Sequence, residues 1–295
     1  SFSLSFARTA PQGDPSLLRA TADHRVVVSA GRPDSVARSD FSGVVPYVTS
    51  RVSAETVTAA GFDLVQMKSD NSIEFSGLVN LRPSLALTLD APIIDLRASP
   101  GGDGSFTTLS TNHLTLMNSS GSPLVANPSL TAPMPLVPTV AGSGTLFANA
   151  RLIDMIGNLT INGVQAGTDP ATGETVRSLV FNSTGDIRLS GTPVLLGRTK
   201  TLGQSADALV GSLNSAADLE LHAQQIYPTT LSEFTLSSLQ VAKNSEGAFV
   251  SANSGEVHIL QAPGISQPVL SAGGKLTLAG DSILQEGTLR APSGS

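Results

Sequence analysis

The sequence contains no cysteine and no tryptophan, and aromatic residues make up only 4% of its 295 residues. Without cysteine the chain forms neither disulfides nor thiolate metal sites. This composition is compatible with export, because no crosslink hinders the passage of an unfolded chain through a pore. The scarcity of aromatic side chains argues against the thick core of an ordinary α/β enzyme. It favours a thin core in which valine, leucine and isoleucine pack in layers.

Charge and long apolar runs are also scarce. Only 14% of the residues are charged, the formal net charge is −6, and the lysines and arginines are scattered. We therefore expect no nucleic-acid partner, because such a partner needs a basic stripe. The sequence contains no run of about eighteen apolar residues, so we predict no membrane-spanning helix. The first six residues lack the basic and apolar regions of a signal peptide, and the chain starts without methionine. We expect a processed or excised piece of a longer protein.

The sequence is rich instead in short alternating apolar patterns. In residues 274–283, Leu276 and Leu278 alternate with small or polar neighbours, so both lie on one side of a strand. Gly280 and Asp281 then supply a corner, and Ile283 adds another aliphatic side chain. The same spacing recurs at Leu87/Leu89/Ile94, Ile187/Leu189/Val194 and Leu219/Leu221/Ile226.

These apolar pairs recur at a nearly constant interval. Pairs starting at positions 219, 239, 257 and 276 are 20, 18 and 19 residues apart, and those at 159 and 179 are 20 apart. Such a period with sharp corners is typical of a solenoid. The sequence therefore predicts an all-β fold, a right-handed parallel β-helix (β-solenoid) with coils of about 19–20 residues and inward aliphatic columns. An antiparallel sandwich, whose strands also recur between turns, is the alternative.

The pattern divides the chain into two parts. We expect residues 1–52 to form an irregular N-terminal part with short strands, and residues 53–295 to form the solenoid. A Pro/Gly/Ser-rich stretch at 118–144 is predicted to protrude from it as a loop, because proline cannot donate ladder hydrogen bonds. Residues 207–213 are compatible with a short helical turn, and no sustained helical period appears elsewhere.

Two Glu-x-His pairs are the candidates for a metal site. Glu220 and His222 share the outward side of one predicted strand, and Glu256 and His258 share that of another, about two coils away. Coordination requires three or four converging ligands, so the pairs are more typical of solvated strand faces. We predict no metal-binding, cofactor-binding or catalytic residue in the chain.

Paired carboxylates in a groove would indicate a polysaccharide-active enzyme. Five aspartates stand at predicted strand edges or corners, where aspartate makes local turn hydrogen bonds: Asp63, Asp90, Asp95, Asp186 and Asp218. The chain has no Gly-x-Ser-x-Gly motif, and residues 197–200 (GRTK) lack the glycines of a phosphate loop. Residues 101–104 (GGDG) are weakly similar to calcium-binding nonapeptides but occur once. We predict that the chain is not an enzyme.

Three asparagines, Asn118, Asn158 and Asn182, begin glycosylation acceptor patterns. In a chain so rich in serine, threonine and asparagine, chance alone explains three such patterns. We expect these side chains to stack in asparagine ladders between coils instead.

Several sequence motifs resemble those of filamentous-haemagglutinin-like exoproteins. They are residues 181–191 (FNSTGDIRLSG), 217–228 (ADLELHAQQIYP), and 271–278 (SAGGKLTL) with 287–292 (GTLRAP). The resemblance covers roughly residues 55–295 and is closest over 178–295. The amino-terminal secretion domain of that family has no counterpart here, which fits an internal or carboxy-proximal segment.

The resemblance implies a very large bacterial protein that is exported by two-partner secretion and forms fibres at the cell surface. It implies a structural or adhesive segment, a stiff rod that mediates attachment, cell aggregation or biofilm matrix formation. The implied partners are the outer-membrane transporter during export, neighbouring coils or copies of the protein, and host or matrix glycans. The alternatives are the stalk of a contact-dependent growth inhibition protein that delivers a toxin, and a polysaccharide-active β-helix enzyme.

Overall fold

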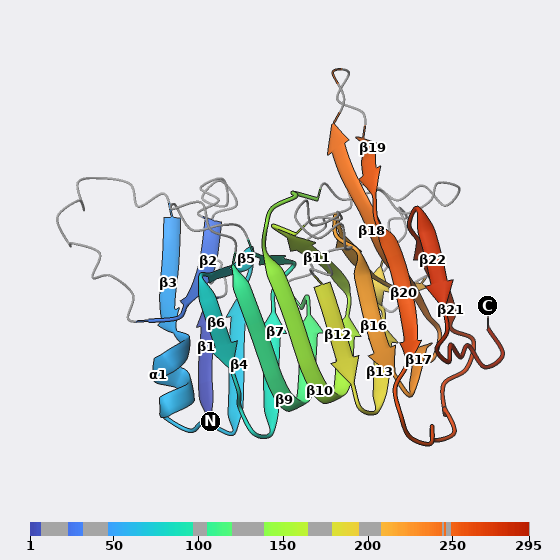
Figure 1. Cartoon of the computed structure of the whole chain (residues 1–295), viewed down its shortest axis with the longest axis horizontal. Coiled ribbons are helices and arrows are strands. Elements are labelled where there is room, and N and C mark those ends of the chain that lie inside the picture. The colour runs from blue at the N-terminus through green and yellow to red at the C-terminus, as the bar shows by residue number, and fades with distance from the viewer. Residues whose placement is uncertain are drawn as a thin grey trace, which may run out of the picture.

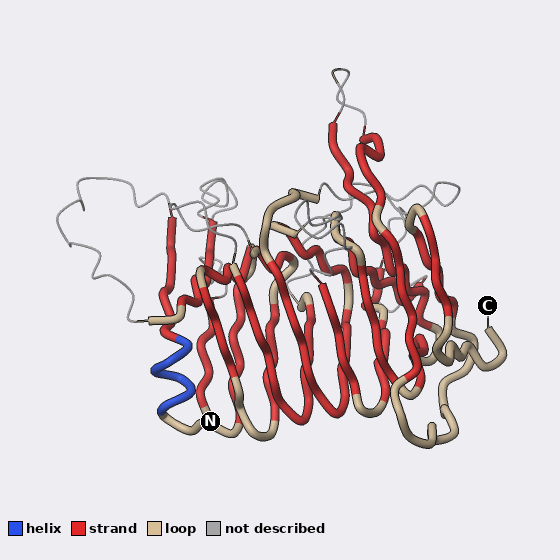
Figure 2. Tube along the Cα trace, in the orientation of Figure 1, coloured by secondary structure: helices blue, strands red, loops and turns tan. Residues whose placement is uncertain are grey.

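The computed structural model describes residues 1–6, 23–31, 47–96, 105–119, 139–164, 179–194, 208–243, 245 and 249–294. Over these residues the chain is all-β, and its one helix is the short α1 (Ala54–Ala59). Strands stand side by side along the long axis of the molecule, from α1 at one end to β22 at the other (Figures 1 and 2). The predicted all-β class is therefore confirmed.

Two large sheets contain the described strands. Sheet A runs through β1 (Phe2–Phe6), β4 (Leu64–Ser69), β7 (Ala86–Asp90), β9 (Phe106–Met117), β10 (Thr145–Ile156), β12 (Leu179–Ser183), β16 (Leu219–Ala223), β20 (Glu256–Gln261) and β22 (Ser282–Gln285), with β6 (Leu78–Leu81), β13 (Asp186–Ser190) and β17 (Gln225–Pro228) beside this path. Sheet B runs through β3 (Tyr47–Ser53), β2 (Asp23–Ser29), β5 (Ser72–Ser76), β8 (Ile93–Asp95), β11 (Asn158–Asn162), β15 (Ala208–Ser215), β18 (Ser232–Lys243) and β19 (Phe249–Ser254), with β14 (Thr192–Val194) and β21 (Lys275–Ala279) beside it.

Pairing in both sheets is parallel except at β14–β15 and β18–β19, as far as the described strands go. An antiparallel sandwich is therefore excluded for this part of the chain. The long strands β9 and β10 each pair with two shorter strands, β9 with β6 and β7, and β10 with β12 and β13. Sheet A consequently has two arms. We call the arm that contains β1, β4, β7, β13, β17 and the second halves of β9 and β10 the lower arm.

Aliphatic columns fill the interior. In the lower arm one column runs in register from β4 to β17 through Val65, Leu87, Leu114, Ile153, Ile187 and Ile226, all buried. Because alternate residues of a strand point to opposite faces, the residues between them face outward. The inward positions predicted at Leu87/Leu89/Ile94, Ile187/Leu189 and Leu219/Leu221/Ile226 are confirmed, whereas Ile283 is exposed. Leu276 and Leu278 are only half-buried, because β21 lies near the end of the stack.

The predicted coil length of 19–20 residues is wrong, because register partners on paired strands are separated by more residues than that. Leu219 pairs with Val257, 38 residues later, and Phe234 pairs with Leu276, 42 residues later. Among the parallel pairs of described strands, the shortest register steps are those from Leu64 to Ala86 and from Ser72 to Ile93. Successive apolar pairs, such as those at 159 and 179 or at 257 and 276, lie on different sheets. Alternation looks the same in sequence whichever sheet a strand joins, so it cannot show which strands are neighbours.

Two local predictions also need correction. The segment 207–213 is not a helical turn, because residues from Ala208 onward form β15, held between β11 and β18. Gly211 suits this position because the Phe234 ring lies over it, only 2.5 Å from where a Cβ would be. The helix α1 was not predicted. Ser53 caps it by accepting a hydrogen bond from the Thr56 amide (3.1 Å), the usual role of serine at a helix N-terminus.

The two ends of the stack differ. At one end α1 buries Ala54 and Val57 and lies against β6, where Thr58 donates to the Asn80 carbonyl (3.2 Å). At the other end the side chains of β22 are exposed, including Ile283 and Leu284. The helix therefore covers a strand edge that would otherwise be open.

The predicted boundary at residues 52 and 53 stays a prediction. The described strands before it, β1, β2 and β3, pair into the same two sheets as the rest of the chain. Most of the predicted loop at 118–144 lies outside the described residues, as do residues 101–104 and 197–200.

Candidate functional site

A continuous row of hydrogen-bonding side chains runs along the outward face of the lower arm. Its members occupy the same register position on seven neighbouring strands, namely Ser3, Gln66, Thr88, Thr115, Asp154, Arg188 and Tyr227. We call this set the polar row. It arises because each residue alternates with the inward aliphatic residues of its strand, so the register that aligns the core columns also aligns the row.

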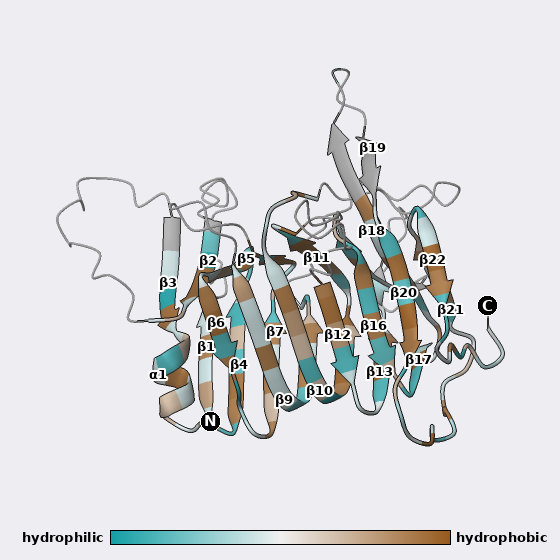
Figure 3. Ribbon diagram, in the orientation of Figure 1, coloured by the Kyte–Doolittle hydropathy of each residue, from teal (hydrophilic) through white to brown (hydrophobic). Residues whose placement is uncertain are grey.

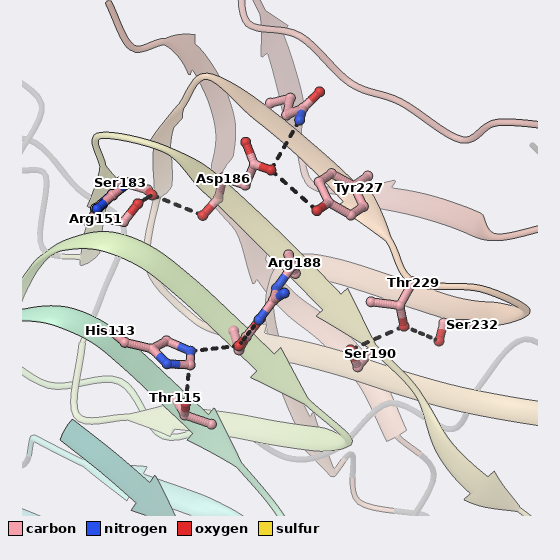
Figure 4. Close-up of polar contacts among 12 residues, drawn as sticks. His113, Thr115, Arg151, Ser183, Asp186, Arg188, Ser190, Tyr227, Thr229 and Ser232 are labelled. Atoms are coloured by element: carbon pink, nitrogen blue, oxygen red, sulfur yellow. Dashed lines mark hydrogen bonds and ion pairs between the residues drawn. The ribbon is translucent and has the colours of Figure 1, made fainter. Parts of the chain in front are cut away.

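The centre of the row is a tightly bonded cluster in which Arg188 and His113, labelled in Figure 4, both contact the carboxylate of Asp154. The Arg188 Nε and Nη2 atoms both donate to the Asp154 carboxylate, each at 2.6 Å. His113 Nε2 lies 2.7 Å from Asp154 Oδ2 on the other side and 3.4 Å from the Thr115 hydroxyl. The Asp154 side chain is 9% exposed, whereas the Arg188 and His113 side chains are 38% and 39% exposed. The aspartate is thus held within the cluster while its partners face solvent.

Bidentate pairing fixes the orientation of the guanidinium, because two parallel N–H···O bonds define its plane. These hydrogen bonds raise the pKa of Arg188, so it remains a cation. The remaining N–H groups of Arg188 point away from Asp154. The cluster therefore presents a preorganised donor on the sheet surface.

A second group of contacts lies beside the row, around Asp186. The Tyr227 hydroxyl donates to Asp186 Oδ2 (3.3 Å), and Gln225 Nε2 donates to the same oxygen (3.1 Å). The Gln225 amide also donates to the Gln267 carbonyl (2.9 Å), which ties the segment after β20 to this face. Burial raises the pKa of Tyr227, and the neighbouring Asp186 carboxylate raises it further. Tyr227 thus stays a neutral hydrogen-bond donor.

This raised pKa of Tyr227 gives a pH prediction. In a Tyr47→Phe variant Tyr227 is the single tyrosine, and we expect its ultraviolet absorbance titration to have a midpoint above the ordinary value of 10.0. Unfolded tyrosine ionises first as the pH rises, so the stabilisation is complete below pH 10 and is lost as the pH rises through the folded-state pKa. Wild-type unfolding free energy should therefore fall more steeply above pH 10 than that of Tyr227→Phe. A midpoint at or below 10 would contradict the assignment.

The two Glu-x-His pairs are closer together than predicted. They lie on β16 and β20, which pair directly, so that Glu220 is the register partner of His258. His222 Nε2 lies 2.5 Å from Glu220, and His258 Nε2 lies 2.6 Å from Glu256. Each histidine is thus engaged with the glutamate of its own strand. Within the described ranges, no group of three or more such side chains has the arrangement of a metal site.

The predicted aspartates mostly join neighbouring strands rather than make local turn contacts. Asp90 accepts from the Ser119 amide (2.8 Å) and from Lys68 (3.1 Å), and Asp218 accepts from the Glu256 amide (2.8 Å). Asp63 accepts from the Ser84 hydroxyl, and Asp95 is buried in β8. Of the five, two lie beside the polar row: Asp186 is two residues from Arg188 on β13, and Asp90 is two residues from Thr88 on β7.

The asparagine ladder occurs at one place among the described contacts. Asn149 and Asn182 are register partners on β10 and β12, and the Asn182 amide donates to Asn149 (3.0 Å). Asn118 is buried and donates instead to the Asn158 carbonyl (2.9 Å), and Asn158 accepts from Ser212 (3.2 Å).

Hydrophilic residues (teal) alternate with hydrophobic residues (brown) along strands of sheet A such as β16 and β20 (Figure 3). Sequence reasoning missed Asp154, Arg188 and Tyr227 as a group. Each sits at an outward position of a recognisable strand, but 34 residues separate Asp154 from Arg188. The only signal was a polar residue between two inward apolar ones, which many strands share.

Comparison with protein families, curated proteins and solved structures finds no match to this chain. In the part of the chain that the structure describes, no helix has the length and apolarity required to cross a membrane.

Proposed function

We propose that this chain is a structural and adhesive segment of a secreted filamentous surface exoprotein, built as a right-handed parallel β-solenoid. The observation that carries the proposal is the in-register parallel stacking of strands along one axis, with aliphatic columns inside and hydrogen-bonding side chains outside. Such a body is a rod rather than a globule, and its surface repeats along its length.

The order of strands supports the solenoid. From β4 the chain passes through β5 in sheet B and β6 in sheet A, and then returns to pair β7 with β4. From β13 it passes in the same way through β15 and β16 to β17, which pairs with β13. Each circuit is one coil and advances the stack by about 4.8 Å. Right-handed coiling is the expected sense, because parallel crossovers are right-handed.

The open end supports a role as part of a longer rod. Parallel strands with exposed edges and apolar side chains, as at β22, accept a further strand. Main-chain ladders would then make the rod stiff, and contacts that are weak individually would be multiplied along its length. The resemblance to filamentous-haemagglutinin-like exoproteins favours export by two-partner secretion to the cell surface, with copies of the protein and glycans as partners.

The proposal is tested in the source bacterium by deleting the gene and measuring surface attachment and cell aggregation. We expect both to fall, and to be restored by the wild-type gene but not by a Leu87→Asp gene, whose product should not fold. Antibody labelling of intact cells should place the protein outside the cell. Unchanged attachment with lost killing of neighbouring cells would instead identify the stalk of a contact-dependent growth inhibition protein.

A further inference from the structure

We propose that the polar row binds a neutral polysaccharide, whose chain lies along the rod axis with about one sugar residue per coil. This inference deepens the adhesive role and rests on it, since it names the ligand class that the rod would hold. It is carried by the register, chemistry and charge of the row, each independent of the resemblance.

The register provides the spacing. The seven members of the row lie on neighbouring strands, one strand spacing of about 4.8 Å apart. A pyranose unit in an extended polysaccharide advances by a similar distance. A sugar chain running across the strands would therefore meet one hydrogen-bonding side chain at each unit, without changing its direction.

The chemistry of the row matches sugar hydroxyls, which both donate and accept hydrogen bonds. Gln66, Thr88 and Thr115 offer amide or hydroxyl groups with both capacities, and Arg188 offers donors. Gln66 is exposed and the others are half-buried, so all four reach the surface. Because Asp154 already fixes the Arg188 side chain, little conformational entropy would be lost when a ligand binds.

Apolar surface beside the row adds the second element that sugar rings require. Tyr227 ends the row and is one of only two tyrosines in a chain without tryptophan. Leu64 and Leu85, at 45% and 53% exposure, lie near its other end, on β4 and immediately before β7. The C–H faces of a pyranose would pack on such side chains while its hydroxyls contact the row.

Charge favours a neutral polymer over an acidic one. Within the row, the negative charge of Asp154 is balanced by Arg188, and the adjacent Asp186 is a further carboxylate. An acidic polysaccharide would be repelled by Asp186 and would find no unpaired cation in the row. Binding should therefore depend little on salt concentration.

The purified chain is tested by affinity electrophoresis and calorimetry with mannan, dextran and galactan as neutral probes and polygalacturonate as the acidic probe. We expect at least one neutral polymer to bind. Its oligosaccharides should bind more tightly with each added unit up to about seven units and no further, because the row spans seven neighbouring strands. Binding should change little when sodium chloride is raised.

Matched variants locate the site. Thr115→Val combined with Tyr227→Ala should weaken binding at least tenfold, whereas Thr277→Val, on exposed β21 of sheet B, should leave it unchanged. Circular dichroism and thermal unfolding confirm that each variant is folded, and Thr115→Val alone serves if the double variant is not. The proposal would be overturned if the chain bound no polymer or preferred polygalacturonate. It would also be overturned if the row variants bound as well as the control variant.

Two further results separate this inference from other functions. Release of new reducing ends from a bound polymer would overturn pure binding and favour the polysaccharide-active enzyme. Loss of cell attachment on gene deletion, together with no polymer binding, would leave the adhesive rod standing and remove the polysaccharide as its ligand. Polymer binding without any attachment defect would support the polysaccharide as the ligand and remove the adhesive role.

Discussion

Replacing Leu87 with aspartate should prevent the chain from folding stably. Leu87 is fully buried in β7, where Val65 and Leu114 are its column neighbours on the adjacent strands. A carboxylate there would have no partner, and burying such a charge costs at least about 4–5 kcal/mol. Since small domains are stable by only about 5–15 kcal/mol, urea denaturation followed by circular dichroism should show little or no folded protein.

The matched control is Thr88→Asp, one residue further along the same strand. Thr88 points outward and is half-buried, so its replacement leaves the core intact and should change the unfolding free energy by about 1 kcal/mol or less. Similar losses at the two positions would show that the inward and outward faces of β7 are assigned wrongly.

The second large effect is expected at Phe181. This ring is fully buried in β12, where Ala148 and Leu221 are its register partners on the neighbouring strands. Phe181→Ala removes more volume than those neighbours can replace, and we expect a loss of about 3–5 kcal/mol in the unfolding free energy. Chemical denaturation should show a lower midpoint for this variant.

Phe147→Ala is the control for this cavity, because it is the same chemical change on the outward side. Phe147 is half-buried, and its ring contacts Phe106 with centroids 5.5 Å apart. Removal of that contact should cost less than about 1.5 kcal/mol. If Phe147→Ala proved as damaging as Phe181→Ala, the outward aromatic pair would be part of a buried interface.

The core and the polar row depend on one structural feature, which is register. A slip of one residue in any strand of the lower arm would turn its aliphatic side chains outward and its polar side chain inward. The aliphatic columns therefore fix the alignment of Thr115, Asp154, Arg188 and Tyr227, although these residues contribute little to the core themselves. The site is as rigid as the sheet that bears it.

The short strands of the chain, their buried faces and the corners between them could be predicted from the sequence. Alternation at Leu87/Leu89 and Leu219/Leu221 correctly predicted strands and their buried faces, and the phrase ending at Ile94 correctly predicted a corner followed by another strand. Scarcity of aromatic residues correctly predicted a mainly aliphatic core, in which Phe75, Phe181 and Phe234 are also buried. These features depend on residues a few positions apart, which the sequence displays directly.

The neighbours of each strand were decided only by the tertiary structure. Alternation is identical in both sheets, and intervening segments of varying length separate the strands, so no sequence period revealed that Leu219 pairs with Val257 rather than with Leu239. For the same reason Asp154 and Arg188 could not be recognised as partners. The sequence by itself determined which side of each strand is buried, because that is a property of adjacent residues. Only the stacking of strands decided which outward side chains meet, because that depends on register across long separations in the chain.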